Sequence, residues 1–256
     1  MGPVKNRVPF PPPIPAMRTL ALDTSHSAGS VAASDGELVV TRPLGVAGEH
    51  ARLLAAELVG VATACGWPLA DAELVAVTRG PGSFTGLRVG LATAKAVAWA
   101  GGIRLVAVSG FEVVARQTAR SAGWNTGSVA IAYDAGRGDV YAAVATADPT
   151  LPAGWRIGPP SLVPAAAWIA GLPHGTRVSG PATDLHATEL SRGGHLLAPA
   201  EARLPNAAAV AEAALLRAAA GWFDDPHALV PEYLRPSYAD EGRQTDRLRR
   251  PPAGRP

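Results

Sequence analysis

The segment at residues 79–102 has the composition of a loop that could bind an anion at the start of a helix. It reads RGPGSFTGLRVGLATAKAVAWAGG, with Gly80 and Gly82 before the hydroxyl residues Ser83 and Thr85. Glycine permits backbone angles that a β-carbon forbids, and Ser83 or Thr85 can accept a hydrogen bond from a free N–H at the helix start. A helix N-terminus with such N–H groups can bind an anion. The alternative is an ordinary strand–turn–helix connection.

The loop fits none of three common catalytic templates. A Walker loop continues with Gly-Lys and then Ser or Thr, but neither Lys nor Ser/Thr follows Gly86. The dinucleotide pattern that would begin at Gly80 requires glycine at position 85, which is Thr85. Ser83 does not stand in the Gly-x-Ser-x-Gly pattern of a nucleophilic serine. The sequence therefore predicts no catalytic role for this loop.

Small residues recur along the helix that should follow the loop. Gly86, Gly90, Ala94 and Ala98 are four residues apart, so they share one side of the helix. Such a stripe allows a second helix to approach closely. Each glycine costs about 1 kcal/mol in a helix relative to alanine, and close packing would offset that cost. We therefore expect this helix to pack on its own sheet and also against a partner.

The composition is that of a globular protein. Of 256 residues, 48% are hydrophobic and 17% are charged, which argues against overall disorder. The sequence contains no uninterrupted run of about 18 apolar residues, so we predict no membrane span. The single cysteine, Cys65, has no partner for an internal disulfide. We expect a buried thiol and a cytoplasmic location.

The basic residues are concentrated at the two ends of the chain. The Pro-rich residues 1–16 and the Arg-rich residues 240–256 each carry a net charge of +2, while the whole chain carries +2, which leaves the body mildly acidic at −2. We predict a disordered extension at 1–16 and a disordered basic tail at 239–256. Electrostatic contact of the tail with RNA is the alternative. Met17 precedes the first strand pattern, and translation could start there.

Hydrophobic patterns predict two lobes, at residues 17–122 and 123–238. In the first lobe, the expected strands and helices follow the order β-β-β-α-β-α-β-α. They lie at residues 18–24, 29–34, 37–42, 49–65, 73–78, 85–100, 104–108 and 110–122. In the second lobe we expect a hairpin of strands 128–134 and 139–147, a strand at 155–163 and several short elements. The last helix should begin after Asn206 and reach about residue 222.

Tandem β-β-β-α-β-α lobes are typical of the actin-like ATPase superfamily, an α/β fold related to ribonuclease H. Five segments make the resemblance more specific. They are LALDTS at 20–25, EHARLL at 49–54, RGPGSFTGLRVGLATAKAVA at 79–98, YDAGRGDVYAA at 133–143 and PEYLRP at 231–236. Together they resemble the TsaB (YeaZ) family over about residues 17–238, and the segment at 79–98 is the most specific part.

This resemblance implies a function in tRNA modification. TsaB is the partner subunit of TsaD in bacterial synthesis of N6-threonylcarbamoyladenosine in tRNA. The implied role is a non-catalytic subunit that docks to a TsaD-like catalytic subunit, with a TsaE-like ATPase as a further partner and a homodimer through the same helices. The implied partner-binding residues are His50, Leu54, Ser83, Phe84, Thr85, Gly86, Arg88, Gly90, Ala94 and Ala98. We expect no cofactor of its own, ATP and a metal in the partner subunits, and at most weak or indirect contact with tRNA.

The resemblance also implies a vestigial nucleotide site. Catalytic members of the superfamily hold Mg²⁺ and phosphate with an aspartate and hydroxyls after the first strand, where this chain has Asp23, Thr24 and Ser25. The alternative is that Asp23 and Thr24 only close a tight turn. The second lobe offers Asp134, but the AGRGD that follows lacks an Asp-Gly-Gly-type phosphate loop. None of the six histidines forms an H-x-x-x-H pair, so no metal site is expected. The alternative function is an ATP-binding small-molecule kinase or ATPase that relies on Asp23 and Asp134.

Overall fold

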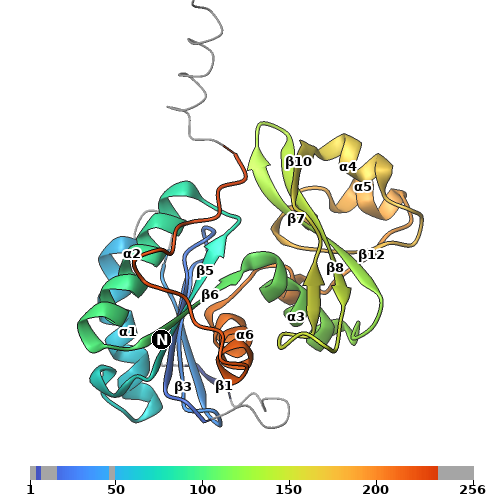
Figure 1. Cartoon of the computed structure of the whole chain (residues 1–256). Coiled ribbons are helices and arrows are strands. Elements are labelled where there is room, and N and C mark those ends of the chain that lie inside the picture. Colours follow the sequence, from blue (N-terminus) through green and yellow to red (C-terminus); the bar gives the residue numbers. More distant parts are fainter. Residues whose placement is uncertain (1–3, 7–15, 46–49, 236–256) are drawn as a thin grey trace, which may run out of the picture.

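The structure, a computed structural model of the chain, describes residues 4–6, 16–45 and 50–235. Within these residues, two six-stranded sheets form the centres of two lobes, and helices cover the sheets (Figure 1). The first sheet has the strand order β1-β4-β3-β2-β5-β6. In the second, the order is β10-β8-β7-β11-β12, and β9 pairs with β8. The two-lobed α/β architecture expected from the sequence is confirmed.

The first sheet combines an antiparallel half with a parallel half. Strands β3 and β4 form a hairpin beside β2, while β2, β5 and β6 run parallel. The three parallel strands are almost continuously apolar, as expected for strands with both faces covered. The bounds are β1 Val4–Asn6, β2 Thr19–Asp23, β3 Ser30–Ser34, β4 Val39–Pro43, β5 Leu74–Gly80 and β6 Arg104–Ser109.

One face of this sheet is covered by α1 (His50–Cys65) and α2 (Phe84–Gly101). In α2, Ser83 is the N-cap and accepts a hydrogen bond from Gly86 N, while Gly102 ends the helix with a left-handed φ of 60°. The α1 face predicted to be apolar is buried, including Cys65, and burial raises the pKa of the Cys65 thiol.

The opposite face of the first sheet is covered by α6 (Ala207–Ala219), the last helix of the described chain. The predicted cap is confirmed, because Asn206 Oδ1 accepts a hydrogen bond from Ala209 N at 3.0 Å. Helix α3 (Gly110–Ala122) packs against both sheets: Val113 belongs to the core of the first sheet, and Phe111 contacts the core around Ile131 in the second. Helix α6 follows the elements of the second lobe in the sequence, and its alanine-rich surface completes the core of the first sheet.

The second lobe contains short elements around the β7–β8 hairpin. The predicted strand at 155–163 is two strands, since Pro159 and Pro160 lie between them and have no N–H for pairing. Bounds are β7 Ser128–Gly136, β8 Asp139–Ala147, β9 Trp155–Ile157, β10 Ser161–Pro164, α4 Ala165–Gly171, β11 Arg177–Ser179, α5 Ala187–Arg192 and β12 Leu196–Leu197, with short 3₁₀ turns η1 Leu69–Asp71, η2 Pro181–Thr183 and η3 Ala200–Ala202.

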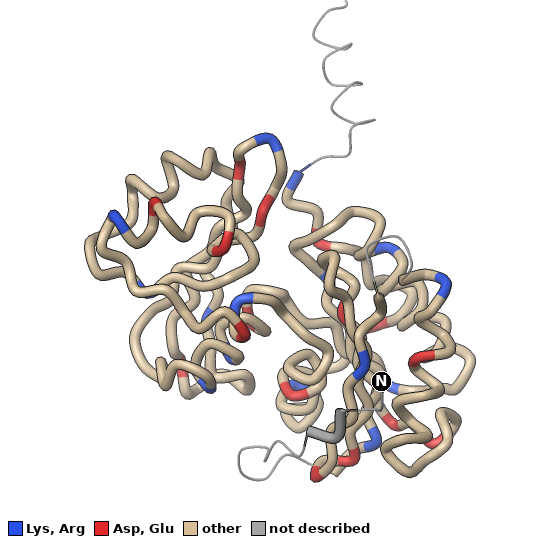
Figure 2. The backbone as a smooth tube through the Cα atoms, turned by 180° about the vertical axis from the view of Figure 1, so that it is seen from behind, with Lys and Arg blue, Asp and Glu red and all other residues tan. Residues whose placement is uncertain are grey.

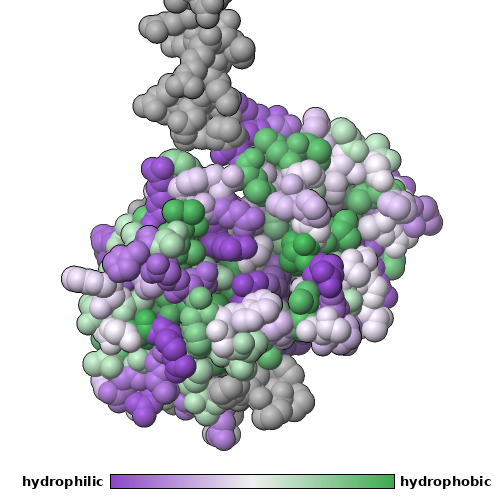
Figure 3. Space-filling view, viewed as in Figure 1, coloured by the Kyte–Doolittle hydropathy of each residue, from purple (hydrophilic) through white to green (hydrophobic). Residues whose placement is uncertain are grey.

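Polar side chains gather where the two lobes meet on the face shown in Figure 3. A cavity of about 440 Å³ lies there. Arg79 Nε lies 3.3 Å from a Glu232 carboxylate oxygen, and Arg217 pairs with the buried Glu112. The first pair holds residue 232, near the end of the described chain, to β5, and the second joins α6 to α3.

The described chain ends as an extended segment along the first lobe, crossing in front of α2 in Figure 1. Asp224 hydrogen-bonds to the edge strand β6 through Leu105 O and Ala107 N, and Leu229 enters the first core. At the other end, part of the extension that was predicted to be disordered forms a strand, because β1 pairs antiparallel with β4. Residues 1–3, 7–15 and 236–256, which include the predicted basic tail, lie outside the described residues.

Among the described helices, none is long and apolar enough to cross a membrane.

Candidate functional site

The turn after β2 is closed by its own side chains. Asp23 is fully buried, its Oδ1 accepts a hydrogen bond from Ser25 N at 3.1 Å, and its Oδ2 lies 3.0 Å from His26 Nε2. His26 Nε2 also contacts Pro205 O at 2.8 Å. Burial by itself lowers the pKa of His26, but the interaction with the Asp23 carboxylate outweighs it and raises the pKa above the ordinary value. Asp23 is thus engaged by groups of the same chain.

The glycine loop packs directly on this turn. Ser83 N donates to Ser25 O at 2.7 Å, and Thr24 Oγ1 donates to Gly86 O at 2.7 Å. A β-carbon on Gly86 would overlap Thr24 O, and one on Gly82 would overlap Ser25 O. The backbone donors and the hydroxyl that would hold a phosphate are therefore used within the protein. Close approach of two backbone segments accounts for these glycines.

The second-lobe acid does not join this turn. Asp134 is exposed, and its Oδ1 accepts a hydrogen bond from Gly136 N at 2.8 Å within its own hairpin. The preceding residue, Tyr133, is buried and interacts with Asp23. Burial and the negative charge of Asp23 raise the pKa of Tyr133 well above its ordinary value, so its hydroxyl stays neutral. The structure brings Asp23, Thr24 and Ser25 together in one turn and leaves Asp134 in its own hairpin.

No group of three or more His, Cys, Asp or Glu side chains in the described ranges is arranged to hold a metal ion.

The small-residue stripe of α2 faces the chain's own sheet. A β-carbon on Gly90 would overlap Thr24 Oγ1 and lie 3.6 Å from Val77 Cγ2. Ala94 and Ala98 are buried in the same core. This corrects the expectation that the stripe receives a partner's helix. The same burial applies to His50 and Leu54, so six of the ten residues predicted to bind a partner lie inside the protein.

The remaining four predicted residues are exposed at the start of α2. Two of them belong to an exposed cluster with Tyr233 from the C-terminal segment. Arg88 Nε donates to Tyr233 Oη at 2.8 Å, and the Arg88 guanidinium carbon lies 3.8 Å from the centre of the Phe84 ring. The two rings are 4.9 Å apart. We call these residues the Phe84–Arg88–Tyr233 cluster; Ser83 and Thr85 are exposed beside it.

Sequence reasoning missed a second set of small residues on α1 and α2. These side chains point away from the sheet, and we call them the exposed α1–α2 face. It comprises Ala51, Ala55, Ala56, Val59, Thr63, Ala92, Ala96, Trp99 and Ala100. Val59 is 52% exposed and Trp99 is 76% exposed. The spacing of four between Ala51, Ala55 and Val59, and again between Ala92 and Ala96, was the available signal.

Comparison with known proteins gives matches to tRNA-modification proteins. A family model described as "TsaD: tRNA N6-adenosine threonylcarbamoyltransferase" matches residues 41–151. The Escherichia coli (strain K12) protein named tRNA threonylcarbamoyladenosine biosynthesis protein TsaB is 35% identical over 126 residues, which are 49% of this chain and 53% of that protein. The Bacillus subtilis (strain 168) TsaB is 30% identical over 126 residues, which are also 49% of this chain and 53% of that protein. The match thus spans about half the length of these two relatives.

Two further matches cover most of the chain. An uncharacterized protein of Mycobacterium tuberculosis (strain H37Rv) is 31% identical over 225 residues, which are 84% of this chain and 90% of that protein. The solved structure titled "YeaZ from Pseudomonas aeruginosa" superposes with a TM-score of 0.70 at 26% identity, over 85% of this chain and 100% of that one. The sequence match to the mycobacterial protein and the superposition on the YeaZ structure therefore each extend over both lobes of this chain.

Proposed function

Because the chain belongs to the TsaB (YeaZ) family and shares its actin-like α/β fold, we propose that it takes part in synthesis of N6-threonylcarbamoyladenosine in tRNA. In this proposal it is a non-catalytic subunit that docks to a TsaD-like catalytic subunit and supports it. A TsaE-like ATPase joins the pair, and the site of action is the cytoplasm. ATP and a metal belong to the partner subunits.

The exposed α1–α2 face is the observation that carries the docking proposal. Small side chains allow a partner's helices to approach the backbone closely. Trp99 adds a large exposed aromatic side chain beside these small residues, and tryptophan is enriched among the residues that contribute most of the binding energy at interfaces. Val59 adds exposed apolar area on α1. The Phe84–Arg88–Tyr233 cluster lies at the start of α2 and adds the residue types enriched at interfaces. A homodimer would use the same face and compete with the TsaD-like partner.

The engagement of Asp23 and Thr24 supports a non-catalytic role. Asp23 is paired with His26, and the Thr24 hydroxyl is donated to Gly86 O. The kinase or ATPase alternative needs these groups for Mg²⁺ and phosphate. Tight binding and turnover of Mg-ATP by the isolated chain would favour that alternative.

A direct RNA-binding role has less support. Basic and acidic residues are mixed over both lobes in Figure 2, and the described chain has no block of positive charge. Binding to tRNA through phosphates would require clustered Lys or Arg. Contact with tRNA in the proposed complex is therefore weak or indirect.

The test is complex formation with the TsaD-like protein of the same organism. Ala96→Arg places a long charged side chain on the exposed α1–α2 face, and Ala167→Arg places it on an exposed position of α4 as the matched control. We expect size-exclusion chromatography to show loss of the complex for A96R and an intact complex for A167R. Equal complex formation by both variants would contradict docking through this face.

A further inference from the structure

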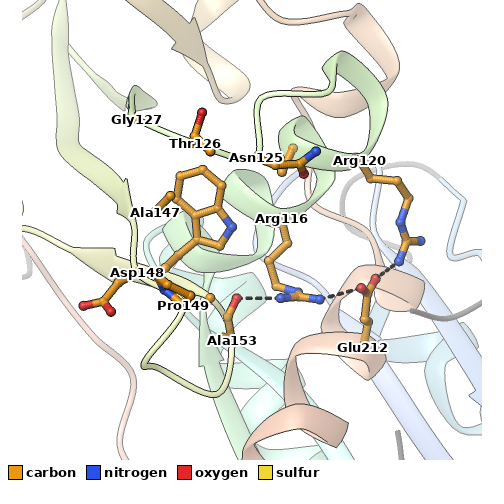
Figure 4. A pocket seen from close by; sticks show the side chains of 13 residues that line it. Arg116, Arg120, Asn125, Thr126, Gly127, Ala147, Asp148, Pro149, Ala153 and Glu212 are labelled. Carbon is orange, nitrogen blue, oxygen red and sulfur yellow. Dashed lines mark hydrogen bonds and ion pairs between the residues drawn. The ribbon is translucent and has the colours of Figure 1, made fainter. Parts of the chain in front are cut away.

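A cavity of about 840 Å³ lies between α3, α6 and the loops at one end of the β7–β8 hairpin (Figure 4). Its walls come from residues 116–120 of α3, residues 125–127, residues 147–155 and Glu212 of α6. None of these residues belongs to the turn around Asp23 or to the exposed α1–α2 face. The volume is within the range of small-molecule sites.

Two arginines share one buried carboxylate at this cavity. Arg116 Nη2 donates to Glu212 Oε1 at 2.5 Å, and Arg120 Nη2 pairs with Glu212 Oε2 (Figure 4). Arg116 Nη1 donates to Ala153 O at 2.5 Å. Glu212 is only 4% exposed. The two arginines and the one glutamate therefore have a net charge of +1 beside the cavity.

The other acidic residue at the cavity does not neutralise this charge. The Asp148 carboxylate accepts hydrogen bonds from Thr150 and Arg156, which lower its pKa. In Figure 4 it points away from Arg116 and Arg120.

The arginines retain unused donors. Arg116 Nε is buried and has no hydrogen-bond partner among the described residues. The Arg120 side chain is 43% exposed and is bonded through Nη2 alone in the described part of the chain. An anion at this position would gain charge-assisted hydrogen bonds.

The rest of the lining is mainly apolar. Trp155, Ala119, Ala147, Ala153 and Pro149 form this part of the wall, and Trp155 is 6% exposed. Trp155 is thus held in place by the core and contributes a rigid apolar part of this wall. Asn125 is exposed at the same cavity and adds a neutral hydrogen-bonding side chain. The cavity thus combines an anion-binding corner with an apolar wall.

We propose that this cavity binds a small organic anion. Its phosphate or carboxylate contacts the exposed guanidinium of Arg120, whose charge adds to that of Arg116 behind it, and its apolar part packs against the apolar wall of the cavity. The proposal is independent of docking to a TsaD-like subunit, because it involves other elements.

Isothermal titration of the full chain tests the proposal with three probes at up to millimolar concentration: adenosine monophosphate, indole-3-acetate and inorganic phosphate. We expect at least one of the two aromatic anions to bind more tightly than inorganic phosphate. Tighter binding of adenosine monophosphate would identify a phosphate as the natural anionic group. Tighter binding of indole-3-acetate would identify a carboxylate. Absence of heat with both aromatic anions would overturn the proposal.

Variants locate the binding. Arg120→Gln removes the exposed guanidinium and should weaken binding about tenfold, the value of a hydrogen bond to a charged group. Arg192→Gln removes an exposed arginine from α5 and is the matched control, with unchanged binding expected. Asn125→Asp adds a negative charge at the cavity and should also weaken binding. Circular dichroism checks the fold of each variant. Equal affinity of wild type, R120Q and N125D would place any binding elsewhere and overturn the proposal.

Discussion

Gly86 of α2 lies against the backbone of Thr24 so closely that a β-carbon on it would overlap the Thr24 carbonyl oxygen. The Thr24 hydroxyl donates to Gly86 O at 2.7 Å, so the contact is also a hydrogen-bonded one. The residue pair joins the start of α2 to the end of β2. It fixes the distance between helix and sheet, and it leaves the Thr24 hydroxyl bonded within the protein.

Gly86→Ala should therefore destabilise the protein. The added methyl group meets backbone, which cannot rotate away, and overpacking of this kind costs on the order of 1–3 kcal/mol. Urea unfolding followed by circular dichroism measures the change. Gly171→Ala at the end of α4 is the control, since a β-carbon there meets nothing within 4 Å. A G86A variant as stable as G171A would contradict the close packing. Gly90→Leu should destabilise the isolated chain for the same reason, because a β-carbon on Gly90 would overlap Thr24 Oγ1.

The Asp23–His26 pair should make stability depend on pH. The folded pKa of His26 is raised above its ordinary value of 6.5. The stabilisation is therefore fully present below about pH 6.5 and is lost as the pH rises through the higher folded pKa. The extra proton goes to Nδ1, at the expense of the 3.2 Å hydrogen bond from Ala28 N.

Urea unfolding at a series of pH values measures this effect. We expect the wild type to lose unfolding free energy across that window and His26→Gln to lose less. His227→Gln is the control, because His227 is exposed. If H26Q and the wild type show the same pH dependence of unfolding free energy, the Asp23–His26 pair does not stabilise the folded protein in this pH window.

Local patterns in the sequence were sufficient to predict most of the first lobe. The apolar run of β5 and the Ser83 and Asn206 caps are each specified by neighbouring residues. Family resemblance then gave the fold class. Short elements of the second lobe were less predictable, because proline pairs and brief apolar runs give weak periodicity.

Which small residues of α2 face the sheet could not be predicted. Gly90 and Ala94 lie on one side and Ala92 and Ala96 on another, and neither spacing distinguishes a buried side from an exposed one. Only the packing of α2 against Thr24 and Val77 determines which side is buried. The location of α6 was unpredictable for a related reason, since its alanines fit either lobe and the long-range packing on β2 and β5 determines the choice.

Trp99→Ala should separate docking from folding. Trp99 is 76% exposed, so its loss should change the unfolding free energy of the isolated chain by no more than about 0.5 kcal/mol. If the exposed α1–α2 face docks the TsaD-like subunit, the same substitution should weaken the complex by about 2 kcal/mol or more. Titration calorimetry measures the affinity. Leu185→Ala, 63% exposed on the second lobe, is the control and should leave it unchanged. Equal affinities for W99A and L185A would exclude Trp99 from the interface.

Glu212 should be the most sensitive charged residue for stability, because it joins α3 to α6 and thereby the two lobes. Glu212→Gln keeps the size of the side chain but leaves Arg116, whose side chain is 13% exposed, without its counter-charge. Removal of one partner from a buried ion pair costs about 3–5 kcal/mol.

Asp184→Asn is the matched control, because Asp184 pairs with Arg203 but its side chain is 53% exposed. Exposed pairs contribute about 0–1 kcal/mol. Thermal and urea unfolding should therefore show a much larger loss for E212Q than for D184N. A small loss for E212Q would mean that apolar packing of α3 on α6, and not the shared carboxylate, holds the lobes together.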